Sequence, residues 1–148
     1  MTATAPALAG RGYDDIAVGE VLPEVAIPLT RTLIVATAIA TRDFQDVHHD
    51  PELARERGSK DVFMNILTSN GLAGRFVTDW AGPFATVRRV KIRLGAPNYP
   101  GDTMTMTGEV VSMDNGLVEV KIQGANSLGN HLSGTVTVAY PASEGKGV

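Results

Sequence analysis

Three aspartates and two of the chain's three histidines lie within one short polar segment, Asp43-Phe-Gln-Asp-Val-His-His-Asp50. An imidazole titrates near neutral pH, so an imidazole beside a carboxylate can take a proton from water and give it back. The residue types therefore indicate acid–base chemistry. The alternative, which composition alone favours, is that the aspartates are turn or helix-cap residues and the histidines are exposed to solvent.

A metal site is the other chemistry that this segment permits, because His48, His49 and Asp50 are all ligand types. Adjacent side chains in an extended loop point apart, however, and the remaining histidine, His131, is distant in the sequence. We therefore expect no metal here. The chain has no cysteine, which excludes a disulfide, a thiolate nucleophile and a sulfur metal site.

Composition and missing motifs exclude several other functions. The sequence contains no Gly-x-Ser-x-Gly elbow, phosphate-binding loop, Gly-x-Gly-x-x-Gly or His-Glu-x-x-His. A net charge of -3 and a pI near 5.5 argue against nucleic acid as a partner. A short basic cluster is interpreted as a solvated strand face, with a site for an anionic ligand as the alternative; it comprises Arg88, Arg89, Lys91 and Arg93.

At 148 residues the chain is long enough for one domain with its own hydrophobic core. We expect that domain to span residues 13–141, between a disordered N-terminus at 1–12 and a flexible tail at 142–148, because both ends are small and polar. The N-terminus lacks the basic start of a signal peptide, and no segment approaches the ~20 apolar residues that span a bilayer. We therefore expect a cytoplasmic protein without a membrane partner.

The elements around the polar segment follow from local patterns. The apolar stretch 21–30 contains two prolines, which suit an edge strand. Thr30 or Thr32 can then cap a helix over 33–40. Pro51 is well placed at the first position of a short charged helix that Gly58 terminates.

A long helix and several strands account for the remainder of the chain. Asp61 is the expected cap of a helix from Val62 to about Trp80, where apolar residues recur at helical intervals. Alternating segments predict strands at 85–94, 103–113, 117–124 and 131–140, with a hairpin turn at Asp114-Asn115-Gly116. This order of elements predicts an α+β domain whose antiparallel sheet wraps round one long central helix.

The spacing Asp43-x4-His48, with Ala54 placed as in His-x5-Ala, resembles the signature of the MaoC-like hot-dog enoyl-CoA hydratases. That signature runs Gly-Asp-x-Asn-Pro-Ile-His, and Pro100-Gly101-Asp102-Thr103 between two strands also matches the hot-dog order of elements. A closer resemblance is to the small catalytic subunit of the actinobacterial cholesterol or steroid side-chain hydratase. The stretches 40–50, 58–61, 65–68 and 77–83 carry that closer resemblance.

Three positions depart from the generic family pattern. Gln45-Asp46 replaces its Asn-Pro, and Arg42 replaces the glycine before the aspartate. These two changes leave the acid and base in place. Met64-Asn65 stands where His-Gly commonly opens the central helix, so the backbone N–H that completes the oxyanion hole is assigned to Asn65 by position alone.

The resemblance implies that the chain adds water to a 2-enoyl-CoA. It implies Asp43 and His48 as the catalytic pair that holds the water, while Asp46, His49 and Asp50 are interpreted as scaffold. An N–H dipole at the start of the central helix would stabilise the charge that moves onto the thioester oxygen. No cofactor is expected, because CoA is part of the substrate.

The resemblance also implies a second MaoC-like hot-dog subunit in an α2β2 heterotetramer, a thiolase- or aldolase-like partner, and a steroid-CoA substrate with a shortened, unsaturated side chain. An unfinished sheet edge makes association expected on physical grounds as well. Two alternatives remain: an acyl-CoA thioesterase on the same fold, and a non-catalytic subunit that only completes a heteromer.

Overall fold

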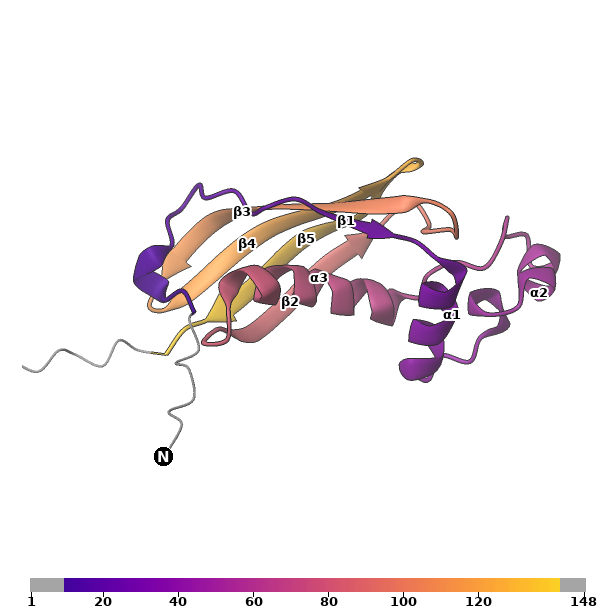
Figure 1. Ribbon diagram of the computed structural model, residues 1–148, viewed down its shortest axis with the longest axis horizontal. Helices are drawn as coiled ribbons and strands as arrows, with labels where there is room; N and C mark the ends of the chain where they lie inside the picture. The colour runs from indigo at the N-terminus through magenta and orange to yellow at the C-terminus, as the bar shows by residue number, and fades with distance from the viewer. Residues whose placement is uncertain (1–9, 142–148) are drawn as a thin grey trace, which may run out of the picture.

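The computed structural model describes residues 10–141, in which one antiparallel sheet lies against a long helix (Figure 1). Its elements in chain order are η1 (Tyr13–Asp15), β1 (Val25–Pro28), α1 (Arg31–Ala40), η2 (Asp46–His48), α2 (Pro51–Glu56), α3 (Ile66–Ala81), β2 (Thr86–Leu94), β3 (Thr103–Asp114), β4 (Leu117–Asn126) and β5 (Gly129–Ala139). The five strands are ordered β1-β3-β4-β5-β2. The predicted α+β hot-dog architecture, a sheet around a central helix, is confirmed.

The short strand β1 lies at one edge of the sheet and pairs with β3, as the two prolines of the stretch 21–30 predict; Pro28 is the last residue of β1. The turn between β3 and β4 is also as expected. There Asn115 and Gly116 adopt φ values of 47° and 78°, which a two-residue turn of this hand requires. Val118 then pairs with Met113, which sets the register of the hairpin.

The hydrophobic core lies between α3 and the concave face of the sheet. Ala73, Phe76, Val77 and Ala81 are buried on one side of α3 at helical spacing. Alternate residues of β3, β4 and β5 meet them, namely Met104, Met106, Val110, Val118, Val120, Ile122, Leu132, Val136 and Val138. This packing fixes α3 against the sheet and leaves its first turn beside α1, at the end of the molecule where α2 also lies (Figure 1).

The central helix begins later than the sequence predicts. Asp61 does not cap a helix from Val62; the chain stays extended as far as Asn65, and α3 starts at Ile66 with Asn65 as its N-cap. The Asp61 carboxylate is occupied by two hydrogen bonds of 2.8 Å from the Arg31 guanidinium and by the Val62 N–H. The carboxylate that the local pattern predicted as a helix cap is therefore bound in an ion pair with Arg31, which is distant in the sequence.

The expected disordered N-terminus, 1–12, is described only at residues 10–12. There the Arg11 guanidinium forms a 2.7 Å ion pair with Glu20 and lies 4.7 Å from the centre of the Trp80 ring. Residues 1–9 and the expected tail 142–148 lie outside the described residues. Within residues 10–141, no helix has the length and apolar character needed to cross a bilayer.

Candidate active site

Asp43 and His48, which the sequence places in one loop, face each other in the structure. His48 Nε2 lies 3.4 Å from Asp43 Oδ2, and the side chains are 9% and 18% exposed. Asp43 follows Arg42, whose φ of 59° is a left-handed conformation that a non-glycine residue seldom adopts. This bend turns the chain back after α1, while η2 carries His48 toward the carboxylate.

A backbone carbonyl fixes which nitrogen of His48 carries the proton. Nδ1 lies 2.7 Å from the carbonyl oxygen of Phe63, which can only accept, so Nδ1–H donates and the neutral ring has no proton on Nε2. The Phe63 ring also packs edge-on against the imidazole, with ring centres 4.9 Å apart. In the neutral ring, Nε2 of His48 therefore presents its lone pair to a carboxylate oxygen, so that two proton acceptors face each other.

The Asn65 side chain contacts the same carboxylate oxygen of Asp43 as His48 does. Its Nδ2 donates to Asp43 Oδ2 at 3.1 Å and to Thr41 Oγ1 at 2.9 Å. Its Oδ1 accepts from the Thr68 N–H at 3.0 Å, the bond that caps α3, and also from the Thr68 hydroxyl. One residue thus connects the first turn of α3 to the carboxylate.

The start of α3 offers unpaired donors close to this pair. Within residues 10–141, neither the Asn65 nor the Ile66 N–H has a hydrogen-bond acceptor, although Asn65 is only 1% exposed. A buried N–H without an acceptor is uncommon in a folded protein. The helix dipole adds partial positive charge at the same end. This location can therefore stabilise negative charge on a bound group.

Both other aspartates of the loop have partners for their side chains. Asp46 forms a 2.7 Å ion pair with Arg57. Asp50 caps α2 by accepting from the N–H groups of Glu52 and Leu53, and His49 is exposed. Over the described range 10–141, no three His, Cys, Asp or Glu side chains lie close enough together to hold a metal ion.

The segment that brings Phe63 to His48 is anchored at its start by charge. Hydrogen bonds from Arg31 lower the pKa of Asp61 from its ordinary 3.8 to about 2, with a further contribution from the Val62 N–H. The main chain is then held by hydrogen bonds from Phe63 N–H to Val47 O and from Met64 N–H to Asn98 O. These contacts fix the position of the carbonyl that orients His48.

A second buried histidine, which the sequence analysis treated only as a distant ligand type, packs beside α3. His131 donates from Nδ1 to the Ala96 carbonyl at 2.7 Å, and its Nε2 lies 2.8 Å from Ser69 Oγ. Because Nε2 has no proton in this tautomer, the Ser69 hydroxyl is the donor. Burial lowers the pKa of His131 from its ordinary 6.5. Strict alternation with Leu132 and Val136 would put His131 on the opposite face of β5. Its burial coincides with the register shift between Gly124 and Ala125 of β4, which no local pattern signals.

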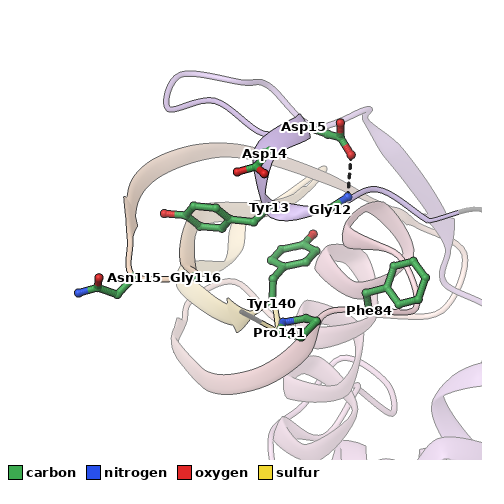
Figure 2. Close-up of a pocket in the computed structure, with 9 residues that line it drawn as sticks. All are labelled: Gly12, Tyr13, Asp14, Asp15, Phe84, Asn115, Gly116, Tyr140 and Pro141. Carbon is green, nitrogen blue, oxygen red and sulfur yellow. Dashed lines mark hydrogen bonds between the residues drawn. The ribbon is translucent and has the colours of Figure 1, made fainter. Parts of the chain in front are cut away.

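A cavity of about 740 Å³ lies beyond the last turn of α3, where Phe84 and Tyr140 line it (Figure 2). Tyr13, Phe84 and Tyr140 are among its lining residues, and none of residues 43–69 contributes to it. The Tyr140 hydroxyl donates to the carbonyl of Ala81 at 2.9 Å, which secures the last turn of α3. The cavity is therefore separate from the candidate site.

Comparisons with known proteins place this geometry in a family. A model described as "MaoC like domain" matches residues 16–130. The "3-oxo-4,17-pregnadiene-20-carboxyl-CoA hydratase beta subunit" of Mycobacterium tuberculosis is 53% identical over 122 residues, which are 82% of this chain and 95% of that protein.

Solved structures agree with this relationship. A chain of the ChsH1-ChsH2 complex from Mycobacterium tuberculosis has 52% identity and a TM-score of 0.82, covering 84% of this chain and 98% of that one. The R-hydratase PhaJ1 from Pseudomonas aeruginosa, at 20% identity, shares the fold with a TM-score of 0.80 and covers 89% and 86% of the two chains. From its sequence, and from the sheet and helix that carry the candidate site, this chain belongs to the family of MaoC-like domains.

Proposed function

We propose that this chain adds water to 2-enoyl-CoA thioesters, with Asp43 and His48 as its acid–base pair. The observation that carries the proposal is the pairing of two proton acceptors, His48 Nε2 and Asp43 Oδ2, at 3.4 Å. A hydrogen bond orients each side chain: His48 donates to the Phe63 carbonyl, and Asp43 accepts from the Asn65 amide. The Mycobacterium tuberculosis relative, whose name describes a CoA hydratase subunit, supports the same reaction.

A single water molecule suits this pair of acceptors. Water has two protons, so it can donate one to His48 Nε2 and one to Asp43 Oδ2 and direct its lone pairs at the substrate. The water oxygen bonds to the β-carbon, one water proton passes to the pair, and the π electrons of the double bond move toward the thioester. The pair then returns a proton to the α-carbon. One water is consumed, and no other reactant is needed.

The developing negative charge on the thioester oxygen needs a donor that is already in place. The unpaired Asn65 N–H at the start of α3 supports this role, because it is buried, close to Asp43 and at the positive end of the helix dipole. We therefore assign the oxyanion contact to the Asn65 N–H, as its position in the sequence suggested. The late start of α3 makes this assignment geometrically possible.

For the substrate we propose a steroid-CoA with a shortened, unsaturated side chain, and for the assembly an α2β2 heterotetramer with a second MaoC-like subunit. The name of the 53% identical relative and the complex that contains the 52% identical chain support both parts. A thiolase- or aldolase-like partner is proposed because retro-aldol cleavage consumes 3-hydroxyacyl-CoA products. A cytoplasmic location follows from the proposed CoA substrate, since CoA thioesters are intracellular metabolites.

The test is an assay of the purified chain, alone and co-purified with a second MaoC-like subunit, on 3-oxo-4,17-pregnadiene-20-carboxyl-CoA. Hydration removes the absorbance of the α,β-unsaturated thioester without releasing a free thiol, and the product gains the mass of one water. Release of free CoA thiol would instead indicate a thioesterase. If neither preparation changes the substrate, the proposal fails for this substrate class, and a short-chain 2-enoyl-CoA tests the general reaction.

A further inference from the structure

We infer that the side chain of Asn65 is a positioning residue, which fixes the Asp43 carboxylate from the N-cap of α3. The inference rests on the proposed hydration and extends it, because the proposed function uses only the backbone N–H of Asn65. It starts from the four hydrogen bonds of one amide, which join Thr41, Asp43 and Thr68 around the candidate site.

The contacts define the orientation of the amide without ambiguity. The Thr41 hydroxyl lies 2.8 Å from the Thr37 carbonyl and gives its only proton there, so toward Asn65 it can only accept. The Thr68 N–H, on the other side, can only donate. Asn65 must therefore present its NH₂ to Thr41 and Asp43 and its oxygen to Thr68. A flipped amide would place oxygen against the Asp43 carboxylate and leave Thr68 without a cap.

All of the amide's hydrogen-bonding capacity is used, with two protons donated and two bonds accepted. Asn65 is also 1% exposed, so no solvent competes for these bonds. The carboxylate of Asp43 is therefore attached to the rigid first turn of α3, although Asp43 itself lies in a loop. Its proposed oxyanion donor, the Asn65 N–H, moves with the same residue.

The Asn65 contact acts on only one member of the catalytic pair. His48 is oriented by the Phe63 carbonyl and has no hydrogen bond to Asn65 within residues 10–141. In that range, His48 is also the titratable side chain that contacts Asp43. A change in the Asn65 side chain should therefore alter how Asp43 binds a proton while it leaves the tautomer of His48 unchanged.

The decisive variant is Asn65→Asp, because aspartate keeps the cap on Thr68 but replaces the donor facing Asp43 with a second carboxylate. Two adjacent carboxylates cannot both ionise freely, so one holds its proton to higher pH. We expect the acidic limb of the kcat/KM profile to move up by about one pH unit or more. We also expect kcat to fall at least tenfold with KM changed less than threefold. Thermal unfolding should occur at a lower temperature, because a carboxylate replaces a fully bonded buried amide, so kcat is expressed per folded molecule.

Asn65→Ser provides a second variant that does not depend on the added charge. Serine is also a good N-cap but is too short to reach Asp43, so kcat should fall at least tenfold. The acidic limb should move up less than in Asn65→Asp, because the Asp43 carboxylate loses a donor without gaining a neighbouring charge. Tyr140→Phe is the matched control, because it removes a buried hydrogen bond at the far end of α3. It should lower thermal stability and leave the pH profile unchanged.

The outcomes separate this inference from the proposed function. If the parent hydrates the enoyl-CoA and both Asn65 variants keep the parental kcat and pH profile, the positioning role is wrong and the proposed function stands. If the variants lose activity only in proportion to lost folded protein, as the control does, the role is structural and the inference is again wrong. A parent without hydratase activity would refute the proposed function itself.

Discussion

The two buried histidines among residues 10–141, His48 and His131, both use Nδ1 to bind a backbone carbonyl. They differ in the group that faces Nε2. Each donates from Nδ1 to a backbone carbonyl at 2.7 Å, so each neutral ring has an unprotonated Nε2. For His131, the Ser69 hydroxyl fills that position at 2.8 Å. For His48, another acceptor, the Asp43 carboxylate, lies there at 3.4 Å.

The difference lies in whether the second ring nitrogen has a hydrogen-bond donor inside the protein. The His131 ring has a partner for both nitrogens inside the protein, so it needs nothing from outside. The His48 ring faces a group that cannot donate, and only a proton or a donating molecule completes the contact. Burial alone does not distinguish them, because their residues are 7% and 3% exposed. The two histidines are distinguished by the group that faces Nε2, a hydroxyl for His131 and a carboxylate for His48.

The largest effect is expected from removing the unsatisfied pair. Asp43→Asn or His48→Ala should lower kcat/KM for enoyl-CoA hydration by a factor of about 10² to 10⁴, because each removes a group that moves a proton in the reaction. Their denaturant midpoints should change little. His131→Gln is the matched comparison, and its activity per folded molecule should stay within about tenfold of the parent. Full activity in both Asp43→Asn and His48→Ala would remove the functional side of the comparison.

The next effect concerns stability and isolates the satisfied pair. Ser69→Ala leaves His131 Nε2 buried without a donor, which should lower the free energy of unfolding by about 1–3 kcal/mol. Urea denaturation followed by circular dichroism measures this loss. His49→Ala, at the exposed histidine of the loop, should change it by less than about 0.5 kcal/mol. Equal losses in the two variants would show that the Ser69–His131 contact contributes nothing specific.

A smaller effect is the pH dependence that His131 gives to folding. Burial lowers the pKa of His131 in the folded state, so below pH 6.5 the unfolded chain binds this proton more readily than the folded chain does. Stability from this group is therefore complete above pH 6.5 and decreases as pH falls toward the folded-state pKa. Chemical denaturation at a series of pH values should show a shallower decline in His131→Gln. An unchanged slope would mean that His131 does not resist protonation.

The smallest effect is expected at the ion pair that begins the segment carrying the Phe63 carbonyl. Hydrogen bonds from Arg31 are the chief cause that lowers the pKa of Asp61 to about 2. The contribution of Asp61 to stability is therefore complete above pH 3.8, its ordinary pKa, and is lost as pH falls toward 2. Arg31→Met should thus be slightly less stable than the parent at neutral pH, with the difference closing in acid. Thermal unfolding at pH 7 and at about pH 2 measures it. A constant difference would exclude this ion pair as its source.

Local patterns in the sequence predicted most of the fold. Prolines located the edge strand β1, and Asn115-Gly116 marked the hairpin, because each feature depends on neighbours in the chain. Of the two candidate caps of α1, Thr30 and Thr32, the structure uses Thr30. The start of α3 was predicted four residues too early, at Val62 instead of Ile66. Asp61 and Asn65 are both good caps, and tertiary contacts distinguish them: Asp61 pairs with Arg31, 30 residues away in sequence, and the main chain at Phe63 and Met64 is bonded outside the helix.

The candidate site was predictable in part for the same reason. The family resemblance that Asp43-x4-His48 carries implied that these two residues act as a pair. The structure brings them within 3.4 Å, and their catalytic role is a proposal. The Phe63 carbonyl and the Asn65 side chain were not predicted as partners. Both contacts require the extended segment before α3 to pass beside η2, which is a tertiary arrangement that no local pattern specifies.

The use of main-chain carbonyls to orient both imidazoles has a consequence for how this protein can diverge. Every residue type carries the same carbonyl group, so a substitution at Phe63 or Ala96 removes a side chain but leaves the acceptor for the histidine in place. Most point mutations at Phe63 or Ala96 should therefore leave the proton on Nδ1 of the ring that this residue orients. Insertions and deletions that move the main chain between residues 59 and 65 are the changes that would disturb it at His48.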